Sequence, residues 1–235
     1  MDRPILAVVM PVYNEAAIIA SVVDQWTSEL EKLALDFQLH IYNDGSKDGT
    51  LAILNEIANK NPRLIVHHKT NSGHGPTILQ AYRENSTTPW LFQTDSDNEM
   101  PASEFHKLWN KRNEYDFLIG SRHHRAQSLG RSLVSFISRV VVWFFYGKSI
   151  KDVNSPYRLM RTEKFKSIFA SMSSLTLTPN LIVTGMVRQL GMRYFEIAID
   201  HEVRKTGKAT ATWRIFEMAC KAFTQVIIFR FTYVR

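Results

Sequence analysis

The amino-acid sequence predicts an α/β protein in which a mostly parallel sheet is flanked by helices. The first basis is an alternation, repeated five times, of short apolar runs with segments whose apolar residues recur at the helical period. The second is size and composition, because 235 residues of which 45% are hydrophobic suit one sizeable globular domain. The third is the position of the polar clusters, which follow the apolar runs where open parallel sheets bind their ligands.

The first part of the alternation begins with the run ILAVVM, at residues 5–10. It is rich in β-branched side chains and ends at Pro11, which is typical of a buried parallel strand. Apolar residues spaced near 3.6 positions apart then predict a helix over 15–35. The same two patterns predict, in order, a strand, a helix and a strand at 37–46, 50–58 and 63–69.

The second part of the alternation predicts, in order, a helix, a strand, a helix and a strand at 75–85, 89–95, 102–112 and 115–122. After Arg122 the pattern changes. The segments 134–147 (VSFISRVVVWFFYG) and 213–235 are apolar and aromatic, with interspersed basic residues. Each predicts a helix, and neither has the length and apolar character of a membrane span. Packing in the core and lying at a membrane interface both remain open for these two helices.

Charge is unevenly distributed along the chain. Residues 1–118 hold 10 basic and 16 acidic side chains, a balance of −6, whereas residues 119–235 hold 19 and 6, a balance of +13. A basic half favours an anionic partner such as nucleic acid, lipid phosphate or a phosphorylated substrate, unless it is merely a solvated face. Cys220 is the one cysteine in the sequence, so no intrachain disulfide forms and a reducing compartment is expected.

An acidic cluster, TDSDNEMP, follows the predicted strand at 89–95. Asp95, Asp97 and Glu99 stand at every second position and repel one another when partly desolvated. Carboxylates in this arrangement suit a hard divalent cation that keeps coordination positions open for a diphosphate. Such a D-x-D pattern also arises by chance, so it gains meaning only together with other motifs.

Seven motifs together resemble the family 2 glycosyltransferases of the GT-A fold. Within that family the sequence is most similar to the branch of dolichyl-phosphate mannosyltransferase and bacterial polyprenyl-phosphate glycosyltransferases. The motifs occur in the family's order and cover about residues 5–210: VVMPVYNE, NDGSKDGT, NSGHGPTILQAY, QTDSDNEMP, IGSR, DVNSPYRLMR and HEVRKTGKAT.

For the donor, the resemblance implies a nucleotide-diphosphate sugar bound with Mg²⁺ or Mn²⁺. Asp95 and Asp97 would hold the metal on the diphosphate, and Glu99 stands where the branch often has a further metal-contacting residue. Asp95 would also contact the nucleotide sugar. The other implied nucleotide-sugar contacts are Pro11, Tyr13, Glu15 and Asp44 around the base and ribose, and Gly73 and Gly75 in the neighbouring loop.

For the acceptor, the resemblance implies phosphate-binding residues in the basic half, namely Arg122, Arg131, Ser135 and Arg204. Arginine suits this task because its fork binds phosphate oxygens through two hydrogen bonds. Asp152 matches an acid near the acceptor that serves as a base in some relatives. The alternative is that Asp152 forms a structural salt bridge to Arg158.

Three departures from the family pattern stand out. Asn43 replaces the acid that usually precedes the D-G-S turn, SPYR replaces S-G-F-R, and GKAT replaces G-x-S-K. The first leaves the preference for UDP or GDP open. The sugar is open as well.

The resemblance implies an inverting glycosyltransferase that transfers a sugar from a UDP- or GDP-sugar to a polyprenyl phosphate, dolichyl or undecaprenyl, in cell-envelope glycan synthesis. Transfer to a glycan or protein hydroxyl and a non-catalytic nucleotide-sugar-binding module are the alternatives. We expect a catalytic domain over 1–210 and an amphipathic helical segment over 211–235.

The expected location is the cytoplasmic face of a membrane, to which the chain binds peripherally. No signal peptide is predicted, because the first four residues lead directly into a short apolar run. An anionic membrane surface is an expected partner. Nucleic acid is not, because no nucleic-acid motif is present. A homodimer remains open.

Overall fold

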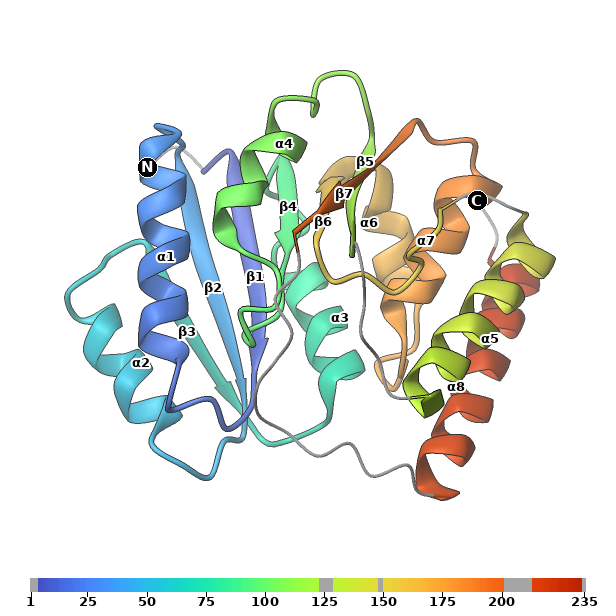
Figure 1. The fold of residues 1–235 in the computed structure, drawn as a ribbon, viewed down its shortest axis with the longest axis horizontal. Helices are drawn as coiled ribbons and strands as arrows, with labels where there is room; N and C mark the ends of the chain where they lie inside the picture. Colours follow the sequence, from blue (N-terminus) through green and yellow to red (C-terminus); the bar gives the residue numbers. More distant parts are fainter. Residues whose placement is uncertain (1–3, 123–128, 148–149, 201–212, 234–235) are drawn as a thin grey trace.

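The computed structural model describes residues 4–122, 129–147, 150–200 and 213–233, and its centre is a mixed sheet (Figure 1). Within these residues the sheet has seven strands in the order β3-β2-β1-β4-β6-β5-β7. All neighbours pair in parallel except β6, which is antiparallel to both β4 and β5. This confirms the predicted mostly parallel α/β sheet. The strands are β1 (Leu6–Val12), β2 (Phe37–Asp44), β3 (Leu64–Lys69), β4 (Trp90–Gln93), β5 (Phe117–Arg122), β6 (Arg158–Arg161) and β7 (Tyr194–Ile199).

Helices cover both faces of the sheet. In Figure 1, α1, α2 and α4 lie on one face and α3, α6 and α7 on the other, with α5 and α8 side by side beyond α7. Their bounds are α1 (Ile19–Lys32), α2 (Thr50–Ala58), α3 (His74–Glu84), a 3₁₀ turn (Ala102–Glu104), α4 (Phe105–Trp109), α5 (Leu129–Tyr146), α6 (Thr162–Ser171), α7 (Pro179–Gln189) and α8 (Trp213–Thr232).

The apolar run of β1 supplies side chains to two separate cores because successive residues of a strand point to opposite faces. Leu6 and Val8 pack with α1 and α4, whereas Ala7 and Val9 pack with α3, α6 and α7. All four side chains are fully buried. A strand buried on both faces is apolar at every position, which is why the sequence shows a continuous run here.

The two apolar segments after Arg122 form α5 and α8, which pack on each other and on α7. The Tyr146 hydroxyl donates a 2.7 Å hydrogen bond to the Val226 carbonyl, and Gly185 of α7 leaves room for the Tyr146 ring. A Cβ at Gly185 would lie 2.7 Å from that ring. One side of each helix therefore belongs to the core. In the described part of the chain, no helix combines the length and the apolar character needed to cross a bilayer.

The sequence prediction and the structure differ mainly in the second half of the chain. The prediction omits β6 and β7, and it gives one helix over 102–112 where the structure has a 3₁₀ turn followed by the short helix α4. The predicted helix over 15–35 starts four residues too early and ends three residues too late, because Glu15 closes a turn before α1 and Ala34, just after it, has a φ of +50°. All five predicted strands are present.

Candidate active site

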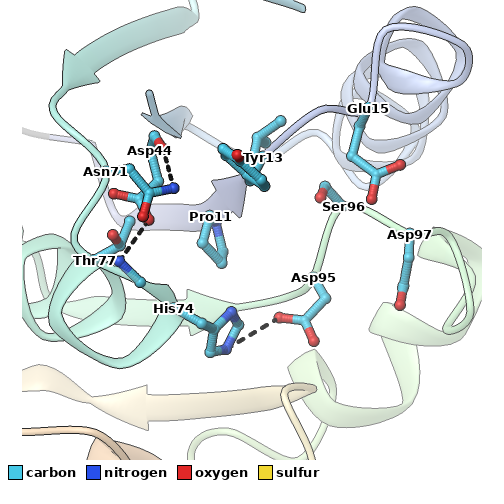
Figure 2. A pocket seen from close by; sticks show the side chains of 12 residues that line it. Pro11, Tyr13, Glu15, Asp44, Asn71, His74, Thr77, Asp95, Ser96 and Asp97 are labelled. Atoms are coloured by element: carbon cyan, nitrogen blue, oxygen red, sulfur yellow. Dashed lines mark hydrogen bonds and ion pairs between the residues drawn. The ribbon is translucent and has the colours of Figure 1, made fainter. Parts of the chain in front are cut away.

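A cavity of about 290 Å³ opens at the carboxyl ends of β1, β2 and β4. The strand order runs outward from β1 in both directions, to β2 and β3 on one side and to β4 on the other. Such a reversal of strand order leaves a crevice at the strand ends, which is where open α/β sheets bind ligands. The residues around the cavity are Pro11, Val12, Tyr13, Glu15, Asp44, Asn71, Gly73, His74, Thr77, Asp95, Ser96 and Asp97 (Figure 2).

Asp44, at the end of β2, is held by hydrogen bonds on one side of this cavity. Its carboxylate accepts hydrogen bonds from Ser72 N at 2.9 Å and Gly73 N at 2.8 Å, and it forms an ion pair with Lys69. Its main-chain carbonyl accepts from Asn71 Nδ2 at 2.8 Å. Burial alone would raise the pKa of Asp44, but the hydrogen bonds from Lys69 and Ser72 hold that pKa below its ordinary value. Asp44 is therefore ionised and fixes the 69–73 loop at the cavity edge.

The loop after β1 is joined to the loop after β2. Asn14 has a φ of +55°, and its main-chain N–H donates a 2.9 Å hydrogen bond to Ser46 Oγ. Glu15 N donates to Thr50 Oγ1 at 2.9 Å. Tyr13, which directly precedes these anchors, remains exposed at the cavity mouth. An exposed ring on a fixed loop is well placed to stack on a planar ligand such as a nucleobase.

The acidic cluster lies on the far side of the cavity. Asp95 Oδ1 is shielded from solvent and has no hydrogen-bond partner, and His74 Nε2 lies 3.9 Å from it (Figure 2). Asp97 Oδ1 accepts a hydrogen bond from Glu99 N at 3.1 Å. Glu99 lines a second cavity of about 10 Å³, room for about one water molecule, that shares Asp95 and Asp97 with the first. The D-x-D carboxylates therefore lie between the two cavities.

A divalent cation fits this arrangement in part. A carboxylate oxygen without a hydrogen-bond partner is the kind of group that a hard cation would satisfy. Within the described residues, however, no group of three or more His, Cys, Asp or Glu side chains could hold a metal ion. The expected trio of Asp95, Asp97 and Glu99 is thus not a preformed cage. A metal here would need oxygens from a diphosphate or from water, as Mg²⁺ sites commonly do.

Arg122, at the end of β5, faces the second cavity and is paired with Asp152. Its Nε and Nη2 donate to the two carboxylate oxygens at 2.8 and 2.9 Å, and its main-chain N–H lies 3.4 Å from one of them. Burial alone would lower the pKa of Arg122, but the hydrogen bond and charge of Asp152 raise that pKa above its ordinary value.

The salt bridge considered between Asp152 and Arg158 is replaced by this pair with Arg122. Arg158 is fully buried, and its guanidinium donates to the carbonyl oxygens of Ser155 and Asn180. The chain turns between Asp152 and β6, so Asp152 and Arg158 lie in the same region but do not form the expected salt bridge. Asp152 acts on Arg158 only through its charge, which partly offsets the lowering of the Arg158 pKa by burial.

The two glycines named for the nucleotide loop have different surroundings. Gly73 lines the cavity, has a φ of +90°, and has open space where a Cβ would be. Gly75 is not among the cavity residues, and a Cβ there would lie 2.1 Å from the Leu177 carbonyl oxygen. Gly75 therefore allows α3 to pack closely against the segment before α7, and its part at the nucleotide stays a prediction.

Three predicted acceptor residues cannot be placed by their side chains. Arg131 and Ser135 belong to the first half of α5, whose side chains are not described. Arg204 lies outside the described residues. Of the predicted acceptor residues, the structure brings Arg122 and Asp152 together beside the D-x-D motif.

Sequence reasoning missed several residues of the site. Lys69, Asn71, His74 and Thr77 either line the cavity or hold Asp44, and Glu196 binds the loop that carries Asp152. The first four stand within or beside the motif NSGHG, so the end of a predicted strand next to a glycine-rich loop was the available signal. Nothing in the pattern around Glu196 marked it.

Comparison with known proteins places this geometry in context. The family model described as "Glycosyl transferase family 2" matches residues 7–169. An undecaprenyl-phosphate 4-deoxy-4-formamido-L-arabinose transferase of Yersinia pestis (strain Pestoides F) is 24% identical over 213 residues, which are 89% of this chain and 64% of that protein. The chain thus spans somewhat less than two thirds of such relatives.

Solved structures share the fold. A mannosyltransferase from Pyrobaculum calidifontis, in complex with GDP-Man and Mn²⁺, superposes with a TM-score of 0.68 at 16% identity, covering 100% of this chain and 66% of that one. A glucosyl-3-phosphoglycerate synthase from Mycobacterium tuberculosis, in complex with Mn²⁺, UDP and phosphoglyceric acid, gives 0.70 at 15% identity, covering 98% and 80%.

Proposed function

The chain belongs to glycosyl transferase family 2, and from that premise we propose that it transfers a sugar from a nucleotide-diphosphate sugar to a polyprenyl phosphate. The observation that carries the proposal is the pair of cavities that meet at Asp95 and Asp97. One has the size and the aromatic edge for a nucleotide, and the other presents Arg122 to an anion. A donor and an anionic acceptor would then meet across the D-x-D motif.

The donor would occupy the larger cavity. Tyr13 would stack on the base, and Asp44 would accept hydrogen bonds from hydroxyl or N–H groups of the nucleoside. Asp95 and Asp97 would hold Mg²⁺ or Mn²⁺ on the diphosphate, and the bound metal would neutralise charge on the leaving group. Support for a metal comes from the Asp95 oxygen that lacks a hydrogen bond and from the Mn²⁺ bound in both solved structures described above.

The acceptor would approach from the side of Arg122. A phosphate monoester is already anionic at neutral pH, so its oxygen attacks C1 of the sugar without losing a proton to the protein. What it needs is a cation that offsets repulsion from the diphosphate. Arg122 is such a cation, and Asp152 holds it in one orientation. We propose a single displacement, which inverts the configuration at C1.

The state of Asp152 favours this acceptor over a hydroxyl. A hydroxyl acceptor needs a general base with a free carboxylate oxygen near the attacking atom. Both oxygens of Asp152 accept hydrogen bonds from Arg122, so the carboxylate is already engaged on both sides. A carboxylate used in this way orients the arginine.

A membrane surface is the proposed location, because a polyprenyl chain is embedded in a bilayer. Phe136, Val140 and Phe144 of α5 are exposed at a spacing of four residues, and α8 adds Ile228 and Phe231. These five side chains are named the α5/α8 patch. Contacts of Phe145 with Phe144 and Phe231, at ring-centroid distances of 5.0 and 6.3 Å, link its two halves.

Charge favours a bilayer over a second copy of the chain on the α5/α8 patch. Arg139 lies over the Trp143 ring and Arg230 over the Phe231 ring, so cations flank the apolar side chains. Each basic residue near an anionic leaflet contributes about 1 kcal/mol of attraction. Two copies of a basic helix pair would instead bring like charges together. We therefore propose peripheral binding at the cytoplasmic face, with 1–210 as the catalytic domain and 211–235 as the segment that completes the membrane-facing side.

The test is a transfer assay with a panel of UDP- and GDP-sugars, Mn²⁺ or Mg²⁺, and a short-chain polyprenyl phosphate. Transfer to the lipid phosphate, lost on adding excess EDTA, is expected, and Asp95→Asn serves as the inactive control. The panel also identifies the base and the sugar. Transfer to a soluble hydroxyl acceptor but to no lipid phosphate would overturn the proposal.

A further inference from the structure

Glu196 of β7 binds the loop that carries Asp152, although it belongs to neither cavity. Its carboxylate accepts hydrogen bonds from Lys151 N at 3.1 and 3.0 Å and from Asp152 N at 3.1 Å. Two consecutive main-chain N–H groups thus point at one carboxylate. Hydrogen bonds to an ionised acceptor are roughly twice as strong as neutral ones. The Glu196 side chain therefore ties the main chain at 151–152 to the sheet.

The pairing of β7 with β5 does not depend on this side chain. The two strands are parallel neighbours over six residue pairs, from Phe117–Tyr194 to Arg122–Ile199. That ladder is made by main-chain groups, which any residue at 196 would supply. The Glu196 carboxylate is half-buried and accepts its hydrogen bonds from the 151–152 loop. The contacts of Glu196 therefore indicate that its side chain holds this loop and not the sheet.

From the loop the contact continues to Arg122. Asp152, whose N–H is bound by Glu196, in turn receives both side-chain hydrogen bonds of Arg122. Arg122 then lines the smaller cavity beside Asp95 and Asp97. An arginine side chain loses rotamer freedom when it is fixed, so a rigid partner matters for where its guanidinium points.

We propose that Glu196 is a positioning residue that orients Arg122 toward the acceptor phosphate by fixing the main chain under Asp152. This inference rests on the proposed function, because it takes an anionic acceptor to be the partner of Arg122. It predicts that loss of the Glu196 carboxylate weakens use of the acceptor and spares the donor. A merely structural residue would affect both.

The first measurement is hydrogen–deuterium exchange of the intact protein. Glu196→Ala removes both acceptors, so the amides of Lys151 and Asp152 should exchange at least about tenfold faster than in the wild type. Glu196→Gln keeps one oxygen that accepts from both amides, so it should restore most of the protection. Glu163→Ala, at an exposed glutamate of α6, is the matched control and should change neither amide. Unchanged exchange in Glu196→Ala would overturn the inference whatever the acceptor is.

The second measurement is steady-state kinetics with a short-chain polyprenyl phosphate. Glu196→Ala should raise the KM for the acceptor about tenfold and leave nucleotide affinity within about twofold. In an Arg122→Ala background the same substitution should have no further effect, because both act through one guanidinium. An equal loss of donor affinity, or a full effect without Arg122, would contradict the positioning role. Absence of transfer by the wild type would instead count against the proposed function, and the exchange experiment would still decide on Glu196.

Discussion

Acidification should destabilise the sheet through a pair of stacked histidines on β2 and β3. His40 is 8% exposed, its Nδ1 lies 3.1 Å from His67 Nε2, and the two rings stack with centroids 5.4 Å apart. Burial, and then the neighbouring His67, lower the pKa of His40 to about 4. Burial also lowers the pKa of His67. The folded protein therefore favours neutral imidazoles in a place where the unfolded chain would protonate them near pH 6.5.

The sign and size of the effect follow from the difference between the two pKa values of His40. Because the folded value is the lower one, its contribution is fully present above about pH 6.5 and is lost as the pH falls toward about 4. A difference of about 2.5 units corresponds to about 3.4 kcal/mol when the loss is complete. At about pH 5 the loss is about 2 kcal/mol. His67 acts in the same direction.

The assay is urea unfolding, followed by circular dichroism, at about pH 7.5 and about pH 5. The quantity compared is the change in unfolding free energy between the two pH values. In His40→Gln, which keeps a polar partner for His67 but does not titrate, this change should be smaller than in the wild type by about 2 kcal/mol. His106→Gln, on α4, is the matched control and should follow the wild type. An equal pH-dependent loss in the wild type and His40→Gln would refute the reasoning.

Three further outcomes are expected. Asp95→Asn should weaken nucleotide binding in the presence of Mn²⁺ by about 100-fold or more and leave the circular dichroism unchanged. Calorimetry measures the affinity, and an unaltered affinity would exclude a role of Asp95 in metal binding. Asp152→Asn should leave the buried Arg122 guanidinium without its counter-charge and lower the unfolding free energy by about 2–4 kcal/mol in denaturant titrations, whereas a neutral effect would show the pair to be dispensable. Gly75→Ala should lower it by at least about 2 kcal/mol because of the close Leu177 carbonyl, and a stability equal to the wild type would disprove that clash.

The first five strands could be predicted because each is an apolar run bounded by turn residues, and the strand-end rule then selected polar residues that line the two cavities. β6 escaped prediction since its four residues, Arg158–Arg161, include two arginines. Arg158 is fully buried there, held by main-chain carbonyls that no local pattern reveals. β7, Tyr194–Ile199, is a half-exposed edge strand whose apolar character is diluted. In both cases tertiary contacts decide the strand.

It was harder to predict which residues of the site pair with each other than to predict which residues line it. Asp44 and Arg122 each end a strand and Asp95 stands two residues beyond the end of β4, so their convergence follows from the topology. The pairing of Arg122 with Asp152 does not follow from the topology, because Asp152 is 30 residues away and its position depends on the loop that leads into the antiparallel strand β6. Glu196, which holds that loop, is 44 residues beyond it. Contacts of this kind depend on loop geometry.

The carboxylates around the two cavities differ in what already compensates their charge. Asp44 has Lys69 and two main-chain N–H groups, and Asp152 has both side-chain hydrogen bonds of Arg122. Asp95 has a shielded oxygen with no hydrogen bond, and His74, Arg122 and Arg158 act on it without bonding that oxygen. A carboxylate whose oxygens the protein itself binds shapes the site, whereas one with an unbonded oxygen attracts a cation from outside. Of these three, Asp95 is therefore the residue at which an external cation would gain most, and it is the one that the two cavities share with Asp97.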